Sequence, residues 1–115
     1  MAAPIVFIDI AGPDDETLKA FYAEVFDWRA DASGQFDLDI PTSIRAAIRK
    51  DPAEKRLYLG VEDITATLEA VEAAGGSIDA RRFEVPGVVV LGLFRDPAGN
   101  PLGLVEMDGP RRRIP

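Results

Sequence analysis

The chain offers few of the side chains that usually carry enzyme chemistry, because its 115 residues include no histidine and no cysteine. A histidine general base and a cysteine thiolate are therefore excluded. The serines lie in no nucleophile motif, and no imidazole is present to activate them. Any chemistry of this chain must rest on carboxylates and arginines.

Glu106 is the first candidate among the carboxylates, because it ends a stretch with a clear local pattern, "LFRDPAGNPLGLVE". This stretch predicts a strand, a tight turn and a second strand. In the turn, Pro97 presets the first dihedral angle, Gly99 can take a positive φ, and Asp96 or Asn100 can hydrogen-bond to the turn backbone. The hairpin thus delivers Glu106 near the end of its second strand.

The overall composition excludes several classes of partner. With 47% hydrophobic and 29% charged residues, the chain is typical of a globular protein. A net charge of −7 argues against nucleic acid, and the basic cluster Arg111–Arg113 reads as a solvated end. No apolar run approaches the roughly 20 residues of a membrane helix. The first residues lack the pattern of a signal peptide, so we expect a cytoplasmic protein without a membrane partner.

The first half of the sequence predicts a strand, a helix and three short strands. Residues 4–10 are dense in β-branched and aromatic residues, which is typical of a strand. Apolar residues then recur at spacings of three and four, which predicts a helix capped by Asp14. We expect the aromatic residues of this helix to be core residues. Its apolar stripe is Leu18, Phe21, Tyr22, Val25 and Phe26, and the three extended pieces after it are "WRA", "QFDLD" and "SIRAAIRK".

The second half repeats this order. "RLYLGV" predicts a strand, and "DITATLEAVEAAGG" predicts a helix capped by Asp63, packed through Ile64, Leu68 and Val71, and ended by its glycines. Three more strands follow. Aligning the two helices gives an internal repeat of about 50 residues. We therefore predict one α+β domain over 1–115, with modules at about 4–50 and 55–108 and a C-terminal tail at 109–115.

Three stretches resemble the vicinal oxygen chelate superfamily, which includes glyoxalase I, bleomycin and fosfomycin resistance proteins and extradiol dioxygenases. They are "FYAEVFDW", "VEDITATLEAVEAAGG" and "FRDPAGNPLGLVE", in the family's order and spacing. The resemblance implies two βαβββ modules that form a curved mixed sheet with helices on its outer face. It also implies a divalent metal in the concave face, held by residues of the first and last strands of each module.

At the matching positions, this chain departs from the metal-binding pattern. Phe7 replaces a residue that is often histidine, and Arg56 falls near the ligand position that starts the second module. Only Glu106 matches a ligand, whereas zinc takes about four donors. We therefore predict no resident cofactor and no tightly bound Zn²⁺, Ni²⁺ or Fe²⁺. Asp9 and Glu106 together would hold Mg²⁺ only loosely unless a substrate completed the shell. Asp27 also stands where relatives commonly have glycine.

Strand alternation suggests a different use of the concave face. Side chains on one face would form a cup in which a guanidinium replaces the metal. We expect Glu106 to be neutralised there by Arg45, Arg49 or Arg56, since a buried carboxylate needs a partner. Two alternatives stay open. Glu106 can be a carboxylate kept by descent or simply paired with an arginine, and the arginines can form a solvated edge strand. The predicted ligand-binding residues are Phe7, Asp9, Arg45, Arg56, Tyr58 and Glu106.

Three functions from different classes fit this pattern. The first is a metal-free glyoxalase-like or bleomycin-resistance-like protein that binds a small molecule in the cup. The second is a divalent-metal-dependent lyase, isomerase or dioxygenase with a degenerate metal site; a structural or regulatory role is a third. We also predict a homodimer, since a short curved sheet leaves strand edges and an apolar cup poorly covered.

Overall fold

The protein is described by a computed structural model that covers residues 2–37 and 44–115. Pro41 and Ser43, which fall in or beside the predicted short strands, lie outside the described residues. The chain divides into two compact units: unit 1 is Met1–Val6 with Leu57–Pro115, and unit 2 is Phe7–Arg56. No helix among the described residues is long and apolar enough to cross a membrane.

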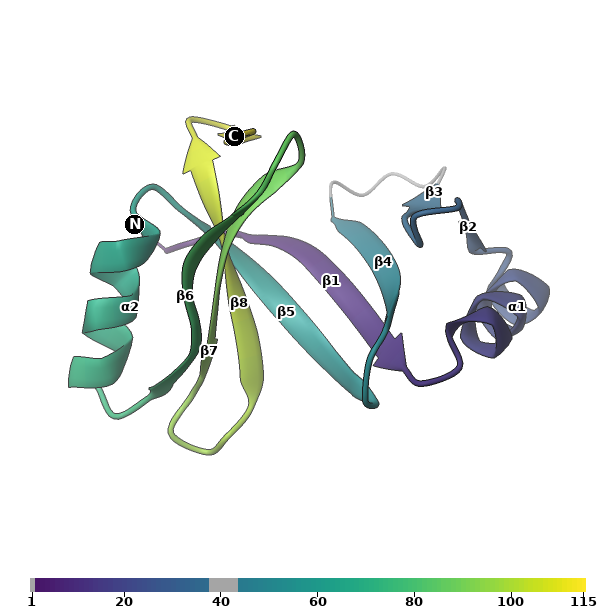
Figure 1. Cartoon of the computed structure of the whole chain (residues 1–115), viewed down its shortest axis with the longest axis horizontal. Coiled ribbons are helices and arrows are strands. Elements are labelled where there is room, and N and C mark those ends of the chain that lie inside the picture. Colours follow the sequence, from purple (N-terminus) through teal and green to yellow (C-terminus); the bar gives the residue numbers. More distant parts are fainter. Residues whose placement is uncertain (1, 38–43) are drawn as a thin grey trace. The chain divides into compact units, whose positions relative to one another are not determined.

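The order of elements is the predicted duplication, strand, helix and three strands, occurring twice (Figure 1). This confirms the α+β fold class. A further two-residue strand follows in the segment that we expected to be a solvated tail. The elements are β1 (Ile5–Gly12), α1 (Asp15–Phe26), β2 (Arg29–Ala30), β3 (Phe36–Asp37), β4 (Arg45–Lys50), β5 (Glu54–Val61), α2 (Ile64–Ala73), β6 (Ser77–Val85), β7 (Val89–Arg95), β8 (Pro101–Asp108) and β9 (Arg111–Arg112).

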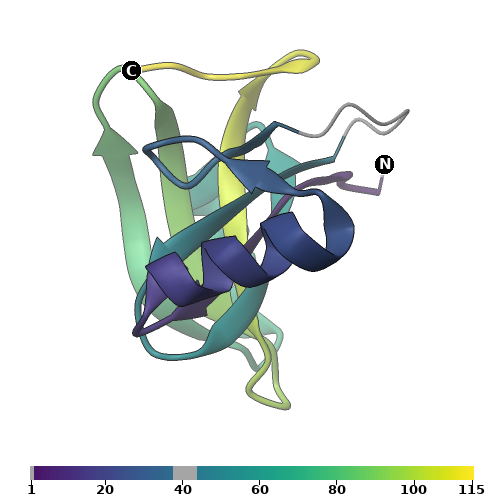
Figure 2. The ribbon, with the colours of Figure 1, turned by 90° about the vertical axis from the view of Figure 1, so that its right-hand side faces the viewer.

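In unit 2, β1 pairs in parallel with β4, and α1 lies across β4 (Figure 2). The predicted cap is confirmed, because the Asp14 carboxylate accepts a hydrogen bond of 3.1 Å from the Thr17 backbone N–H. The hydrophobic core of the unit is made by short strands and by one side of the helix. Its buried members are Phe36, Ala46 and Ile48, against which Ile10, Leu18, Tyr22, Trp28 and Ala30 pack.

The core interpretation of the α1 aromatic residues was wrong for two of the three. Tyr22 packs in the core and stacks on Trp28 with ring centroids 5.7 Å apart. Phe21 and Phe26, however, are about half exposed, as is Val25. The apolar stripe of the helix is wider than the small surface that β2, β3 and β4 offer it, so one edge of the stripe stays in contact with water.

Helix α1 ends at Asp27, which adopts a left-handed conformation with φ 58°. The sequence departs from the glycine common in relatives at this position, and the structure gives the consequence: an L side chain held where glycine is favoured. We expect Asp27→Val to lower the free energy of unfolding by about 1–2 kcal/mol, whereas Asp27→Gly should be neutral or stabilising. Urea denaturation of both variants checks this. Equal stability of the two variants would contradict the proposed backbone strain.

In unit 1, β5 pairs in parallel with β8, and β7 pairs antiparallel with both β8 and β6. The predicted cap and inner stripe of α2 are confirmed. The Asp63 carboxylate accepts a bond of 3.0 Å from the Ala66 N–H, and Ile64 and Leu68 are fully buried, with Val71 packed against them. Helix α2 thereby fills one face of this sheet with apolar side chains.

The turn before β8 and the tail after it are both held by backbone contacts. As predicted, Gly99 has a positive φ and Asp96 accepts hydrogen bonds from two backbone N–H groups of the turn. In the tail, β9 pairs antiparallel with β8, and the Arg113 N–H donates to the Glu106 carbonyl oxygen at 2.8 Å. The arginine side chains of the tail are exposed, as expected, but its backbone is tied to the sheet.

Candidate functional site

The two faces of the unit 1 sheet differ in what covers them. Alternate residues of β8 point to opposite faces. Leu102 and Leu104 belong to the core under α2, so Gly103 and Val105 lie on the other face. Helix α2 contacts β6, β7 and β8, and it is the only helix among the described residues of this unit. The second face therefore has no helix of this unit over it.

Glu106 lies on the face covered by α2, two residues beyond Leu104 and opposite Val61 in the register. Its side chain is 8% exposed and accepts two hydrogen bonds from Arg82, at 2.8 and 2.9 Å, and an ion pair from Arg113 at 3.2 Å. The Arg82 hydrogen bonds lower the pKa of Glu106. Burial opposes this shift, and the backbone N–H of Ile64 at the start of α2 reinforces it.

The prediction that an arginine neutralises Glu106 is thus confirmed, but the predicted arginines were the wrong ones. The partners are Arg82 and Arg113 rather than Arg45, Arg49 or Arg56. The predicted grouping with Tyr58 was also wrong, because Tyr58 aligns with Gly103 on the opposite face of the sheet. Side chains alternate along β5 and β8 as expected. The sequence did not indicate, however, that the Glu106 side of β8 faces α2.

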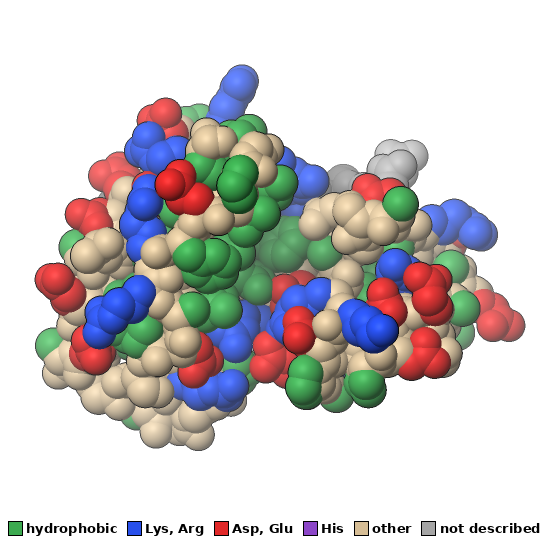
Figure 3. All heavy atoms as spheres, in the orientation of Figure 1, with side chains coloured by type: hydrophobic (Ala, Val, Ile, Leu, Met, Phe, Trp, Pro, Cys, Tyr) green, Lys and Arg blue, Asp and Glu red, His purple; other side chains and the backbone are tan. Residues whose placement is uncertain are grey.

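The helix-free face of unit 1, which we call the open face, is an apolar surface that crosses four strands. One row runs from Phe83 through Leu91 to Val105, and the next runs from Leu93 to Tyr58. Phe83 is 37% exposed, the two leucines are half-buried, and Val105 and Tyr58 are buried. In Figure 3, hydrophobic side chains gather over the β6–β7 hairpin, which supplies three of these five residues.

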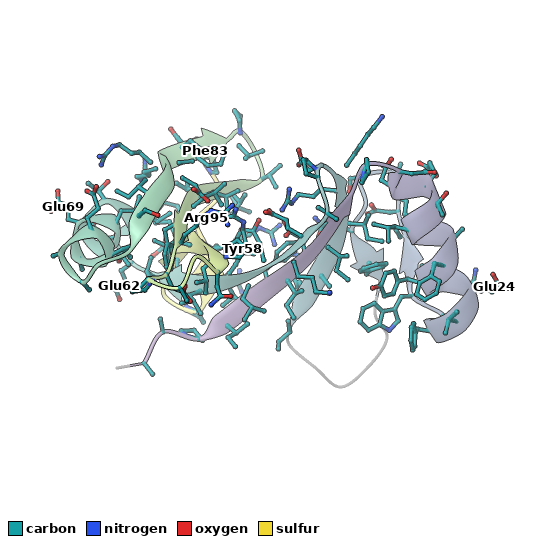
Figure 4. The ribbon with its side chains drawn as sticks, turned by 90° about the horizontal axis from the view of Figure 1, so that it is seen from below. Glu24, Tyr58, Glu62, Glu69, Phe83 and Arg95 are labelled. Carbon is teal, nitrogen blue, oxygen red and sulfur yellow. The ribbon has the colours of Figure 1, made fainter. Side chains whose placement is uncertain are left out.

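Two residues shape the edges of the open face. The Tyr58 ring covers Gly103, where an added Cβ would lie 2.4 Å from two ring carbons. Arg95 continues the alternation of Leu91 and Leu93, and its guanidinium is held by Asp79 at 3.2 Å and by the Gly99 carbonyl at 3.1 Å. Figure 4 labels Tyr58, Phe83 and Arg95 on the strands of this unit. The face is thus apolar at its centre, with a guanidinium at one end.

Sequence reasoning did not single out Phe83, Leu91 and Leu93, which lie together on the open face. A usable signal was present in "VVVLGLFR", which is apolar at successive positions rather than at alternate ones. A strand that is apolar on both faces is typical of a sheet that packs against other groups on both faces. In β7, the side chains of Val90 and Phe94 pack against α2, and those of Leu91 and Leu93 form part of the open face.

Three of the predicted residues of unit 2, Phe7, Asp9 and Arg45, lie on the side of β1 and β4 opposite α1. Phe7 aligns with Arg45, and Asp9 follows on the same face. Asp9 is buried and forms an ion pair of 3.0 Å with Arg49. The shared strand face of Phe7 and Asp9 agrees with the predicted alternation, and the Asp9 carboxylate is engaged by a guanidinium.

Arg49 is the centre of an ion-pair network in unit 2. Besides Asp9, it contacts Asp51 at 2.8 Å and Glu54, and Glu54 also meets the buried Arg56 at 3.4 Å. Burial alone would lower the pKa of Arg49, but the bonds to Asp51, Asp9 and Glu54 outweigh it and raise that pKa. For Glu54, burial alone would raise the pKa. The hydrogen bonds and charges of Arg49 and Arg56 outweigh this effect and lower the pKa of Glu54. The ion pairs of this network thus favour the charged forms of Arg49 and Glu54.

The divalent metal implied by the resemblance does not fit the residues present. In the described parts of the chain, no three Asp or Glu side chains are grouped so that they could hold an ion. Asp9 and Glu106, the two predicted loose donors, are each engaged by arginine, and a cation beside an arginine would be repelled. The absence of tightly bound metal stays a prediction.

Comparisons with known proteins agree on the fold. A profile of the glyoxalase-like domain matches residues 5–105. The hypothetical protein BH1468 from Bacillus halodurans C-125 is 10% identical with a TM-score of 0.67, covering 98% of this chain and 100% of that chain. Methylmalonyl-CoA epimerase from Mycobacterium tuberculosis is 12% identical with a TM-score of 0.61, covering 90% and 87%.

A Streptomyces coelicolor methylmalonyl-CoA epimerase variant in complex with 2-nitronate-propionyl-CoA is 13% identical with a TM-score of 0.64, covering 98% and 99%. No curated protein sequence matches the chain. At these identities the solved structures establish a shared fold alone. The predicted resemblance to the vicinal oxygen chelate superfamily is confirmed.

Proposed function

Because the chain belongs to the glyoxalase-like domain family, we propose that it binds a small organic molecule on the open face of unit 1 without a tightly held metal ion. The observation that carries this proposal is the apolar surface of Phe83, Leu91 and Leu93, which no helix of the described unit covers. Apolar walls with a few polar groups at their edge are the usual chemistry of small-molecule sites.

The lining suggests the class of ligand. Phe83 offers aromatic surface to a planar or acyl group, and the Arg95 guanidinium lies at the end of the same face. An anionic group on the ligand would compete with Asp79 for that guanidinium. The ligand-binding roles of Phe7, Arg45 and Arg56 stay predictions. Cytoplasmic location and the lack of a nucleic-acid partner are likewise proposed, the second on the net charge of −7.

A second candidate function is catalysis, as a lyase, isomerase or dioxygenase that recruits a divalent cation together with its substrate. The similarity to methylmalonyl-CoA epimerases favours it, since one of those structures contains methylmalonyl-CoA. For this chain, acyl-CoA esters are therefore the first compounds to test. Exchange of an acidic substrate hydrogen in heavy water, followed by NMR with and without Mg²⁺, would separate this function from simple binding.

We expect Phe83→Ala to weaken a ligand found by screening about tenfold or more, because the change removes the most exposed ring of the open face. The screen uses chelator-dialysed protein, thermal shift and calorimetry, with planar carboxylic acids and acyl-CoA esters as probes. Phe21→Ala is the matched control, since Phe21 is 50% exposed on α1. Equal losses for the two variants, or binding that requires added metal, would contradict the proposal.

A further inference from the structure

Helix α1 carries an exposed apolar patch with acidic neighbours. Phe21, Val25 and Phe26 are 50%, 56% and 55% exposed, and Phe21 and Val25 are four residues apart on one side of the helix. Glu24 and Asp27, beside them in the chain, are exposed too. A grouped set of large apolar side chains rimmed by charges is typical of an interaction surface. We call these five residues the α1 patch.

Unit 1 carries a second exposed apolar patch, with basic neighbours. Val88 and Ile114 are 47% and 59% exposed. They are brought together because the tail lies along the β6–β7 turn, with the Arg112 Nε donating to the Val88 carbonyl oxygen at 3.0 Å. The tail patch, as we call it, consists of Val88, Ile114 and the run Arg111–Arg113.

We propose that the α1 patch of one copy docks on the tail patch of a second copy of this chain. The argument is charge complementarity. The chain has a net charge of −7, and Arg111–Arg113 is the longest basic run of its sequence. Since Arg113 is paired with Glu106, Arg111 and Arg112 supply the attraction for an acidic helix. Apolar residues at the centre of both patches supply the contact area, and the opposite charges around them fix which surface meets which.

Such a contact closes into a dimer when a twofold axis relates the copies, because each copy then supplies one patch of each kind to the other. The dimer would cover the half-exposed edge of the α1 stripe, for which the short strands of unit 2 give too little surface. It would also account for a tail that is fixed to the sheet by β9 while its arginine side chains stay exposed.

The test uses charge reversal at one exposed residue of each patch. Glu24, labelled on α1 in Figure 4, and Arg111 both have exposed side chains, so the fold should survive the change. In sedimentation equilibrium, Glu24→Arg and Arg111→Glu should each weaken the wild-type dimer at least about tenfold. Glu69→Arg, on exposed α2 surface, is the matched control and should leave the dimer unchanged.

Mixing the two variants makes the test specific for these two patches. An equimolar mixture of Glu24→Arg and Arg111→Glu should dimerise again. In the mixed dimer, one contact joins the two substituted patches, whose charges are exchanged but still opposite. The other contact joins an unchanged α1 patch to an unchanged tail patch.

Three results would overturn the proposal. A wild-type chain that is monomeric throughout the micromolar range has no such contact. A dimer that survives both single reversals forms through another surface. Single variants that remain monomeric when mixed, while circular dichroism reports them folded, lack the pairing of the two patches.

Discussion

Replacing Glu106 with glutamine is expected to lower the free energy of unfolding by about 2 kcal/mol. The carboxylate is the meeting point of β8, β6, the tail and the start of α2, through Arg82, Arg113 and the Ile64 N–H. An amide cannot accept the paired hydrogen bonds of a guanidinium, and it carries no charge. The two arginines are 37% and 45% exposed, so water can rehydrate them, which keeps the loss below that of a fully buried pair.

The pH dependence of the free energy of unfolding provides a second test of the role of Glu106. Because the pKa of Glu106 is lowered in the folded state, its contribution to stability is fully present above the usual glutamate pKa and is lost as the pH falls through the lowered folded value. Urea denaturation from neutral to acidic pH should therefore give a smaller acid-induced loss for Glu106→Gln than for the wild type. Glu69→Gln, at an exposed site, controls for the removal of one charge.

This expectation differs from the ligand-binding role that the sequence suggested for Glu106. Since Glu106 lies on the α2 side of β8, ligand binding on the open face should change little in the folded variant. A variant that unfolds like the wild type but loses its ligand would restore the earlier interpretation.

The sequence predicted those features that depend on neighbours along the chain. The caps Asp14 and Asp63 and the turn at Asp96 are satisfied by residues within four positions, so local chemistry decides them. The order of elements followed from the change of hydrophobic period for the same reason. These features needed no knowledge of what packs against what.

The features that were mispredicted depend on contacts between distant segments. Alternation placed Tyr58 and Glu106 each on one face of its own strand, but the relative facing follows from the register of β5 with β8. The partner Arg82 lies on β6, where two irregularities in the pairing with β7 alter the alternation. The register shifts leave no clear trace in "SIDARRFEV", so the arginine could not have been chosen from the sequence.

Gly103 should be the glycine on the open face that tolerates substitution least. Its Cα is the register partner of Tyr58, and a Cβ would lie 2.4 Å from the ring atoms Cδ2 and Cε2. The ring itself is buried and cannot swing freely into water. We expect Gly103→Ala to lower the free energy of unfolding by about 2 kcal/mol, the usual cost of overpacking. The displaced ring should also weaken any ligand bound on the open face.

A double-mutant cycle distinguishes a clash with Tyr58 from destabilisation by alanine at residue 103 for any other reason. Tyr58→Val removes the two ring carbons that lie 2.4 Å from the added Cβ, so alanine at residue 103 should then gain the roughly 0.5–1 kcal/mol by which alanine exceeds glycine inside a strand. Gly103→Ala should therefore destabilise the wild type and stabilise the Tyr58→Val protein, as measured by urea denaturation. The same loss in both backgrounds would mean that Tyr58 does not cover Gly103, and the ring would then not shape this edge of the open face.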